Sequence, residues 1–210
     1  MSKACSTIHK LTNKLQRHFF PFDVSLIPYN GIYILFQNGE CGHNQDRIVR
    51  VGTHTGQRQL RARLKQHFLT PNKDRSIFRK NIGRALLNMR KDTFLKHWDI
   101  DLITKEARKK YASKIDHDYQ NHIAMEVSRY IQKNFSFVAF EVHDKAERLS
   151  TESKLISTVS LCDECKQSHA WLGNHSTKTK ILESGLWLVN ELYKTPFNSY
   201  EVQELTTYLN

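Results

Sequence analysis

The feature that most constrains the fold of this chain is the stretch from residue 31 to residue 67. Two short apolar runs, 32–36 and 48–51, are separated by a segment rich in Asn, Gly, His and Asp. Apolar runs separated by turn-forming residues are typical of a two-stranded antiparallel ribbon. The segment 57–69 then carries apolar residues at a spacing of four, which indicates a helix. We therefore expect a β-hairpin followed directly by a helix.

Polar side chains occupy one edge of this predicted unit. Arg63 and His67 are four residues apart, so they lie along one edge of the apolar stripe of the helix. We expect both side chains to point across the edge of the sheet toward Tyr33 on the first strand. A tyrosine, an arginine and a histidine that converge at the edge of a hairpin form a constellation suited to handling phosphate.

The order of these residues resembles the GIY-YIG nuclease superfamily. The resemblance rests on Gly31-Ile32-Tyr33, on a second strand that ends in Arg50-Val51-Gly52, and on the pattern Leu60-x-x-Arg63-Leu64-x-x-His67. There are two departures from the family pattern. Arg50 stands where the second tyrosine usually lies, and the loop that follows is a few residues longer than usual. Some restriction-type members are similar in placing a basic residue at this position.

The resemblance implies an α+β fold with a small three-stranded antiparallel sheet flanked by helices. The clearest further strand is 135–142, which is rich in β-branched and aromatic residues and is expected to be the central strand. We expect an N-terminal helical arm at 1–30, and a catalytic core at 31–72 and 135–210 that closes with the C-terminal segment. The segment 73–134 is interpreted as a helical, basic insertion, where target recognition would reside.

The basic charge of the chain is concentrated in one stretch. Between residues 47 and 114 there are 19 Lys or Arg against 5 Asp or Glu, and this local balance of +14 exceeds the net charge of +11 of the whole chain. Such a stretch is expected in a nucleic-acid-binding protein, with a solvated basic surface as the alternative. We expect the helix after Ser76 to turn its basic side chains outward. The residues predicted to contact nucleic acid are Arg61, Lys65, Lys73, Arg75, Arg79, Lys80 and Arg84.

The segment 145–161 predicts a helix after the third strand, with Glu152 in the middle of its apolar stripe. A buried, unpaired carboxylate is costly, so Glu152 needs either an arginine partner or a cation. The resemblance favours the cation, because Glu152 with its apolar neighbours Leu155 and Ile156 is similar to the metal-binding glutamate of the family. The resemblance also assigns Asn174 to the site, at a place where some restriction-type members have an asparagine.

The resemblance implies a metal-dependent endonuclease that hydrolyses DNA phosphodiester bonds, with a sequence-specific, restriction-like role. Glu152 would hold Mg²⁺ or Mn²⁺, Tyr33 would act as general base or position the water, and Arg63 would clamp the phosphate. Double-stranded DNA is the expected substrate, and a cut in both strands would favour a homodimer. The catalytic residues implied by the resemblance are Tyr33, Arg50, Arg63, His67, Glu152 and Asn174.

Two functions from other classes remain open at this point. Arg50 in place of tyrosine also fits a catalytically degenerate GIY-YIG scaffold that binds nucleic acid without cleaving it. The aromatic segment 171–192 fits a protein-interaction module. No run of residues approaches the ~18 apolar residues of a membrane span, and no secretory signal is evident, so a cytoplasmic protein is expected.

The four cysteines show no disulfide framework. Cys162 and Cys165 form a Cys-x-x-Cys pair. Together with Cys41 and His43 they have the residue types of a Cys3His zinc site. The two pairs lie far apart in the chain. Ordinary reduced thiols are the favoured interpretation.

Overall fold

The computed structural model describes residues 2–111 and 113–209. The strands are β1 (His18–Phe19), β2 (Gly31–Gly42), β3 (Gln45–Gly52) and β4 (Phe135–Glu141). The α-helices are α1 (Ser2–Lys14), α2 (Leu60–Phe68), α3 (Ile77–Met89), α4 (Leu95–Trp98), α5 (Lys105–Tyr111), α6 (His117–Asn134), α7 (Lys145–Ser160), α8 (Thr179–Ser184) and α9 (Ser199–Leu209). Three 3-10 turns are η1 (Val24–Leu26), η2 (Lys73–Arg75) and η3 (Leu172–His175).

The strands form one antiparallel sheet in the order β1-β4-β2-β3. The predicted hairpin of β2 and β3 is confirmed. It turns through His43 and Asn44, which both have positive φ, as a two-residue turn that matches the strand twist requires. The sheet has four strands rather than three, because the two-residue β1 pairs with β4. A strand this short carries no sequence periodicity, so the pattern did not reveal it.

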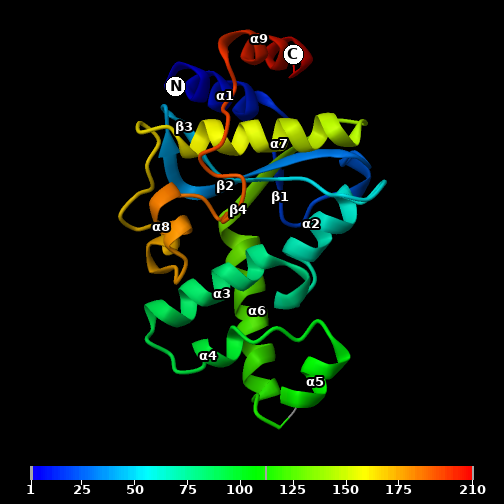
Figure 1. The fold of residues 1–210 in the computed structure, drawn as a ribbon, viewed down its shortest axis with the longest axis vertical. Helices are drawn as coiled ribbons and strands as arrows, with labels where there is room; N and C mark the ends of the chain where they lie inside the picture. The colour runs from blue at the N-terminus through cyan, green and yellow to red at the C-terminus, as the bar shows by residue number, and fades with distance from the viewer. Residues whose placement is uncertain (1, 112, 210) are drawn as a thin grey trace.

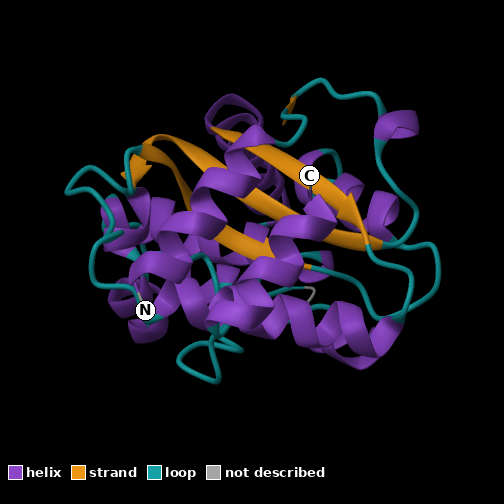
Figure 2. Ribbon diagram, turned by 90° about the horizontal axis from the view of Figure 1, so that it is seen from above, coloured by secondary structure: helices purple, strands orange, loops and turns teal. Residues whose placement is uncertain are grey.

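The sheet separates two apolar cores. Successive residues of β2 point to opposite faces, with Ile32 and Ile34 on one side and Tyr33 and Leu35 on the other. Helices α1 and α7 cover the first face, with α9 against α1 (Figures 1 and 2). Helices α2, α3 and α6 lie on the second face. Residues from α2 and from β2 therefore share one core, while α7 approaches the sheet from the opposite side.

The N-terminal segment is integrated into these layers. Cys5, Ile8 and Leu11 of α1 are buried in the core that α1 shares with α7 and α9. Within the described residues, none of the helices is both long and apolar enough to span a membrane.

The segment 73–134, the predicted insertion, carries α3 to α6 and extends away from the sheet (Figure 1). Gly83 on α3 allows the indole of Trp98 to pack closely, since a Cβ at this position would lie 2.4 Å from the ring. The expected outward orientation of Arg79, Lys80 and Arg84 is wrong, because all three side chains are buried. Helix α3 is enclosed by η2, η3, α4 and α6, so it has too little solvent-facing surface to expose them.

Candidate active site

The predicted convergence of Tyr33 and His67 is present in the structure. Tyr33 Oη lies 2.7 Å from His67 Nε2, and His67 Nδ1 lies 2.7 Å from Ser76 Oγ. Burial holds the pKa of His67 well below its ordinary value, and the charges of three nearby arginines lower it further. His67 is therefore neutral at neutral pH. One of its nitrogens donates and the other accepts, so it joins Tyr33 to Ser76 in one hydrogen-bonded chain.

Arg50 reaches this chain because of a bulge in β3. Val49 has no pairing partner on β2, so the side chains of Val49 and Arg50 both lie on the face of the sheet that carries Tyr33. Arg50 Nε donates to Tyr33 Oη at 3.4 Å, and Arg50 Nη1 donates to the carbonyl of Trp187. The residue that departs from the family pattern is thus in direct contact with the motif tyrosine.

Glu152 of α7 lies at the end of β3. Its Oε1 accepts a hydrogen bond from the backbone N–H of Thr53 at 3.0 Å. Burial raises the pKa of Glu152 to about 7, although the charge of Arg50 and the Thr53 hydrogen bond lower it. No described Lys or Arg forms an ion pair with this carboxylate. The arginine partner that would make Glu152 purely structural is therefore absent from the part of the chain that the structure describes.

A pocket of about 430 Å³ brings Glu152 together with Arg50 and Arg63. Oxygen-bearing side chains share its lining, among them Asn190 and Glu191. Carboxylate and amide oxygens are the ligands that Mg²⁺ and Mn²⁺ prefer. Glu152 also has a second oxygen for which the described residues supply no hydrogen-bond donor. The donor set therefore fits a hard divalent cation.

Two of the predicted catalytic residues lie behind this pocket. Tyr33 and His67 are fully buried and are not among the residues that line it. Arg63 is half-buried, lines the pocket and donates to the side chain of Gln66 and to the carbonyl of Arg75, each at 3.3 Å. The structure thus provides an inner tyrosine and histidine, and an outer pair of arginines beside the glutamate.

Asn174 is not brought to the site. It is exposed on η3, where its amide donates to the carbonyls of Ser168 and His169, and it does not line the pocket. Asn190 lines the pocket instead. The sequence pattern does not single out Asn190, because Asn190 lies in an irregular segment, where no helical or strand period marks which residues point inward.

Four of the residues predicted to bind nucleic acid are buried and bound to other parts of the protein. Arg79 donates to the carbonyls of His67 and Ala124, at 2.8 and 2.9 Å. Lys73 and Lys80 form ion pairs with Asp74. The buried Arg84 forms an ion pair with the exposed side chain of Asp99, with 2.5 Å between Nε and Oδ1. These four side chains hold the insertion together, and their charged groups are already occupied.

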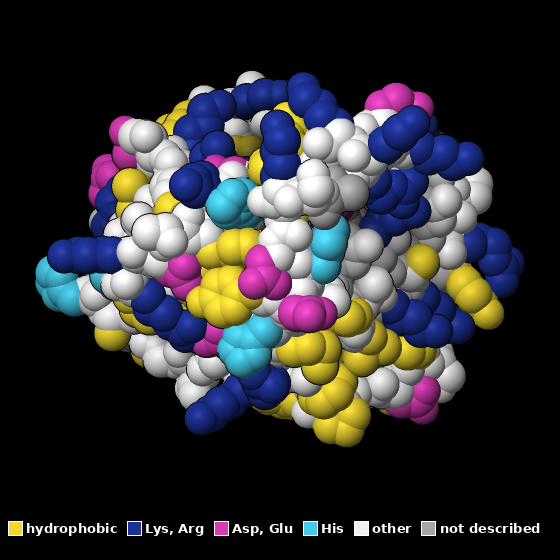
Figure 3. Space-filling model, turned by 90° about the horizontal axis from the view of Figure 1, so that it is seen from below, with side chains coloured by type: hydrophobic (Ala, Val, Ile, Leu, Met, Phe, Trp, Pro, Cys, Tyr) yellow, Lys and Arg dark blue, Asp and Glu magenta, His cyan; other side chains and the backbone are white. Residues whose placement is uncertain are grey.

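The other three lie nearer to solvent. Lys65 and Arg75 are exposed. Arg61 is half-buried, and it donates to the carbonyls of Ile27 and Ser25. Figure 3 shows Lys and Arg spread widely over the end of the molecule that the insertion forms, with hydrophobic and acidic groups between them. Of the predicted set, Lys65 and Arg75 keep side chains that are free to meet a phosphate backbone.

The fold and the site define a class: a small α+β domain in which a hairpin, the helix after it and a glutamate-bearing helix gather a tyrosine, a histidine, two arginines and a carboxylate. The family model described as the GIY-YIG domain matches residues 5–209, and the chain belongs to this family. Membership supports a nuclease-type function and a nucleic acid as substrate. Comparisons with curated proteins and with solved structures gave no significant match.

Proposed function

We propose that this protein is a metal-dependent endonuclease that hydrolyses phosphodiester bonds of double-stranded DNA, with a sequence-specific, restriction-like role. The observation that carries the proposal is the pocket in which Glu152, a half-buried carboxylate with no ion-pair partner among the described residues, faces two arginines. A phosphate would meet the arginines, and a divalent cation would satisfy the carboxylate. Glu152, Arg50 and Arg63 then gain ionic partners when substrate and cation are present.

Arg50 and Arg63 bind and orient the scissile phosphate. A guanidinium presents a planar fork of N–H donors that matches two phosphate oxygens, which a lysine cannot do in the same geometry. Glu152 would hold Mg²⁺ or Mn²⁺, and such a cation would supply Lewis-acid stabilisation of the phosphate and the leaving oxygen. Thr53 keeps the carboxylate of Glu152 in place through its backbone N–H.

Tyr33 positions the attacking water or, in a phenolate form that has already lost its own proton to solvent, accepts the proton of that water. When the proton of His67 is on Nε2, His67 and Arg50 both donate to the Tyr33 oxygen, and this arrangement stabilises a negative charge there. Because Tyr33 is buried, this role requires the side chain of Arg50 to move toward the phosphate and open the hydroxyl to the pocket.

A second candidate function is a catalytically degenerate domain that binds nucleic acid without cleaving it. The burial of Tyr33 favours this alternative, because the hydroxyl has no access to the pocket while Arg50 donates to the Trp187 carbonyl. Lys65 and Arg75 would then contribute to a salt-sensitive affinity with no turnover. The two candidates share the same surface and differ only in the chemistry of the pocket.

Supercoiled plasmid incubated with the purified protein, with Mg²⁺ added or omitted, separates the two candidates. We expect Mg²⁺-dependent nicking or linearisation that falls by about 100-fold or more in Tyr33→Phe and Glu152→Gln. Glu147→Gln is the matched control, since Glu147 is exposed on the same helix and lies outside the pocket. Binding without cleavage under every metal would leave the degenerate scaffold. Discrete fragments would establish sequence specificity.

Cleavage of both strands requires two copies of the site, so we include a homodimer on DNA in the proposal. Sedimentation of the protein with and without a cleaved duplex tests this part. A monomer on DNA that converts plasmid only to the nicked form would contradict the homodimer and leave the nuclease activity intact.

A further inference from the structure

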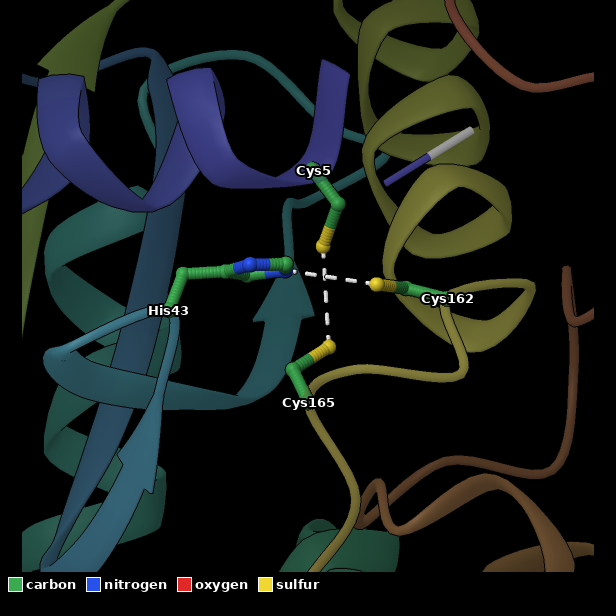
Figure 4. Close-up of side chains that lie close together, drawn as sticks. All are labelled: Cys5, His43, Cys162 and Cys165. Carbon is green, nitrogen blue, oxygen red and sulfur yellow. Dashed lines mark hydrogen bonds between the residues drawn. The ribbon is translucent and has the colours of Figure 1, made fainter. Parts of the chain in front are cut away.

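A second cluster of metal-binding side chains lies away from the pocket. Cys5, His43, Cys162 and Cys165 each direct one ligand atom at a common point, and these atoms lie within 4.8 Å of one another (Figure 4). Cys41, the partner of His43 in the combination drawn from the sequence, is exposed and is not in the cluster. Cys5 of α1 takes its place.

Two distances between ligand atoms of this cluster are close to those of a tetrahedral zinc site. Zinc binds thiolate at about 2.3 Å, so two sulfurs on adjacent corners of the tetrahedron are about 3.8 Å apart and a sulfur and a nitrogen slightly less. Cys5 Sγ lies 3.6 Å from Cys165 Sγ, and His43 Nε2 lies 3.2 Å from Cys162 Sγ. All four cysteines of the chain are free thiols.

Local structure explains why these side chains converge. His43 is at the tip of the β2–β3 hairpin, in the left-handed conformation that the turn requires. Cys162 and Cys165 follow the end of α7, and the two residues between them let the chain turn so that both sulfurs face the same way. Gly42 permits the approach, because a Cβ there would lie 2.9 Å from the Cβ of Cys165.

The surroundings of His43 are those of a zinc ligand. Its Nε2 faces the sulfurs, and its Nδ1 faces Glu164 Oε2 at 3.7 Å. A carboxylate on the outer nitrogen is the usual second partner of a metal-bound histidine. The neighbouring His9 is excluded as a ligand, because its Nε2 accepts from the N–H of Ile48 and its Nδ1 lies 2.9 Å from the carbonyl of Cys5.

We infer that Cys5, His43, Cys162 and Cys165 form a structural zinc site, separate from the cation site at Glu152. Four protein ligands fill the coordination shell, which is the arrangement of structural rather than catalytic zinc. The site ties α1 to the hairpin tip and to the C-terminal end of α7. Because Glu152 lies on α7, the zinc also anchors the helix that carries the proposed catalytic carboxylate.

The test is the metal content of the full-length protein purified without added chelator. We expect about one zinc ion per chain by inductively coupled plasma mass spectrometry, and almost none in Cys165→Ser. Cys41→Ser is the matched control, since Cys41 neighbours the hairpin tip but is exposed, and it should keep its zinc. Zinc retained by Cys165→Ser, or a metal-free protein with four reactive thiols or a disulfide, overturns the inference.

A measurement on the unmutated protein covers the case in which the variants fail to fold. Titration of the native protein with a mercurial that binds thiols should release about one equivalent of zinc to a colorimetric indicator. Replacement of the zinc by Co²⁺ should give the thiolate charge-transfer bands and the intense visible bands of tetrahedral coordination. Iron in the purified protein, or octahedral Co²⁺ spectra, would refute a Cys3His zinc site. None of these readouts depends on nuclease activity.

Discussion

The carboxylate of Glu152 is predicted to destabilise the metal-free protein above neutral pH. Its pKa rises from 4.5 to about 7 on folding, chiefly because of burial. A shift of this size corresponds to about 3 kcal/mol. The folded protein holds the proton more tightly than the unfolded chain does. Stability from this group is therefore fully present below pH 4.5, and it is lost as the pH rises through about 7.

Glu152→Gln removes this charge and keeps the shape of the side chain. At pH 8.5 in Mg²⁺-free buffer we expect the variant to be more stable than the unmutated protein by up to about 3 kcal/mol, and at pH 4.5 we expect the difference to vanish. The measurement is urea unfolding at both pH values, followed by circular dichroism. Comparing two proteins at each pH cancels the contributions of every other titrating group, the zinc ligands included.

Glu147→Gln serves as the control, and its stability should track that of the unmutated protein at both pH values. Added Mg²⁺ should stabilise the unmutated protein at pH 8.5 and leave Glu152→Gln unchanged, since a ligand stabilises only the state that binds it. If Glu152→Gln is equally or less stable at pH 8.5, the carboxylate is satisfied within the protein. Such a result would refute the inference that Glu152 needs a cation.

Three further predictions follow from the packing and the electrostatics. Gly83→Ala should lower the free energy of unfolding by about 1–3 kcal/mol, because the new methyl group meets the ring of Trp98 at 2.4 Å; an unchanged urea midpoint would contradict this close contact. Lys65→Gln should lower the affinity for DNA and reduce the salt slope of binding by about 1, without changing the free energy of unfolding. Arg79→Gln should mainly lower the free energy of unfolding, because Arg79 is buried. The reverse pattern would refute the division into free and buried basic residues. His67 has a depressed pKa in the folded protein, so the stability that the neutral imidazole contributes is present above pH 6.5 and is lost as the pH falls. In His67→Gln, the free energy of unfolding should therefore fall less steeply as the pH drops below 6.5. Equal slopes for the two proteins would show that His67 does not take up a proton on unfolding.

Local sequence patterns determined a large part of this fold. The apolar runs 32–36 and 48–51 and the turn-forming segment between them predicted the hairpin, and the spacing of Leu60, Leu64 and Phe68 predicted the helix that follows. The pairing of Tyr33 with His67 was within reach for the same reason. Both residues are placed by regular elements whose periods are short enough to read directly from the chain.

The exposure of the basic side chains could not be predicted from these local patterns. The period of α3 shows which residues share a face, but it cannot show how many faces are covered. Arg79 is buried against α6 and Arg84 is paired with Asp99 at the end of α4, because these helices pack on sides of α3 that a two-layer domain would leave open. A high local charge therefore indicated nucleic-acid binding through residues that are, in part, structural.

The sequence by itself determined the hairpin, the helix that follows it, the strand 135–142, the family motif and the place of Glu152 on the helix after that strand. Only the tertiary structure decided the bulge that brings Arg50 to Tyr33, the position of Asn174 outside the pocket, and the meeting of Cys5 with His43 and the Cys-x-x-Cys pair. The physical reason is the range of the interactions. Helix and strand periods arise from contacts a few residues apart. A bulge, a pocket or a metal site depends on which distant segments pack together, and no local pattern records that choice.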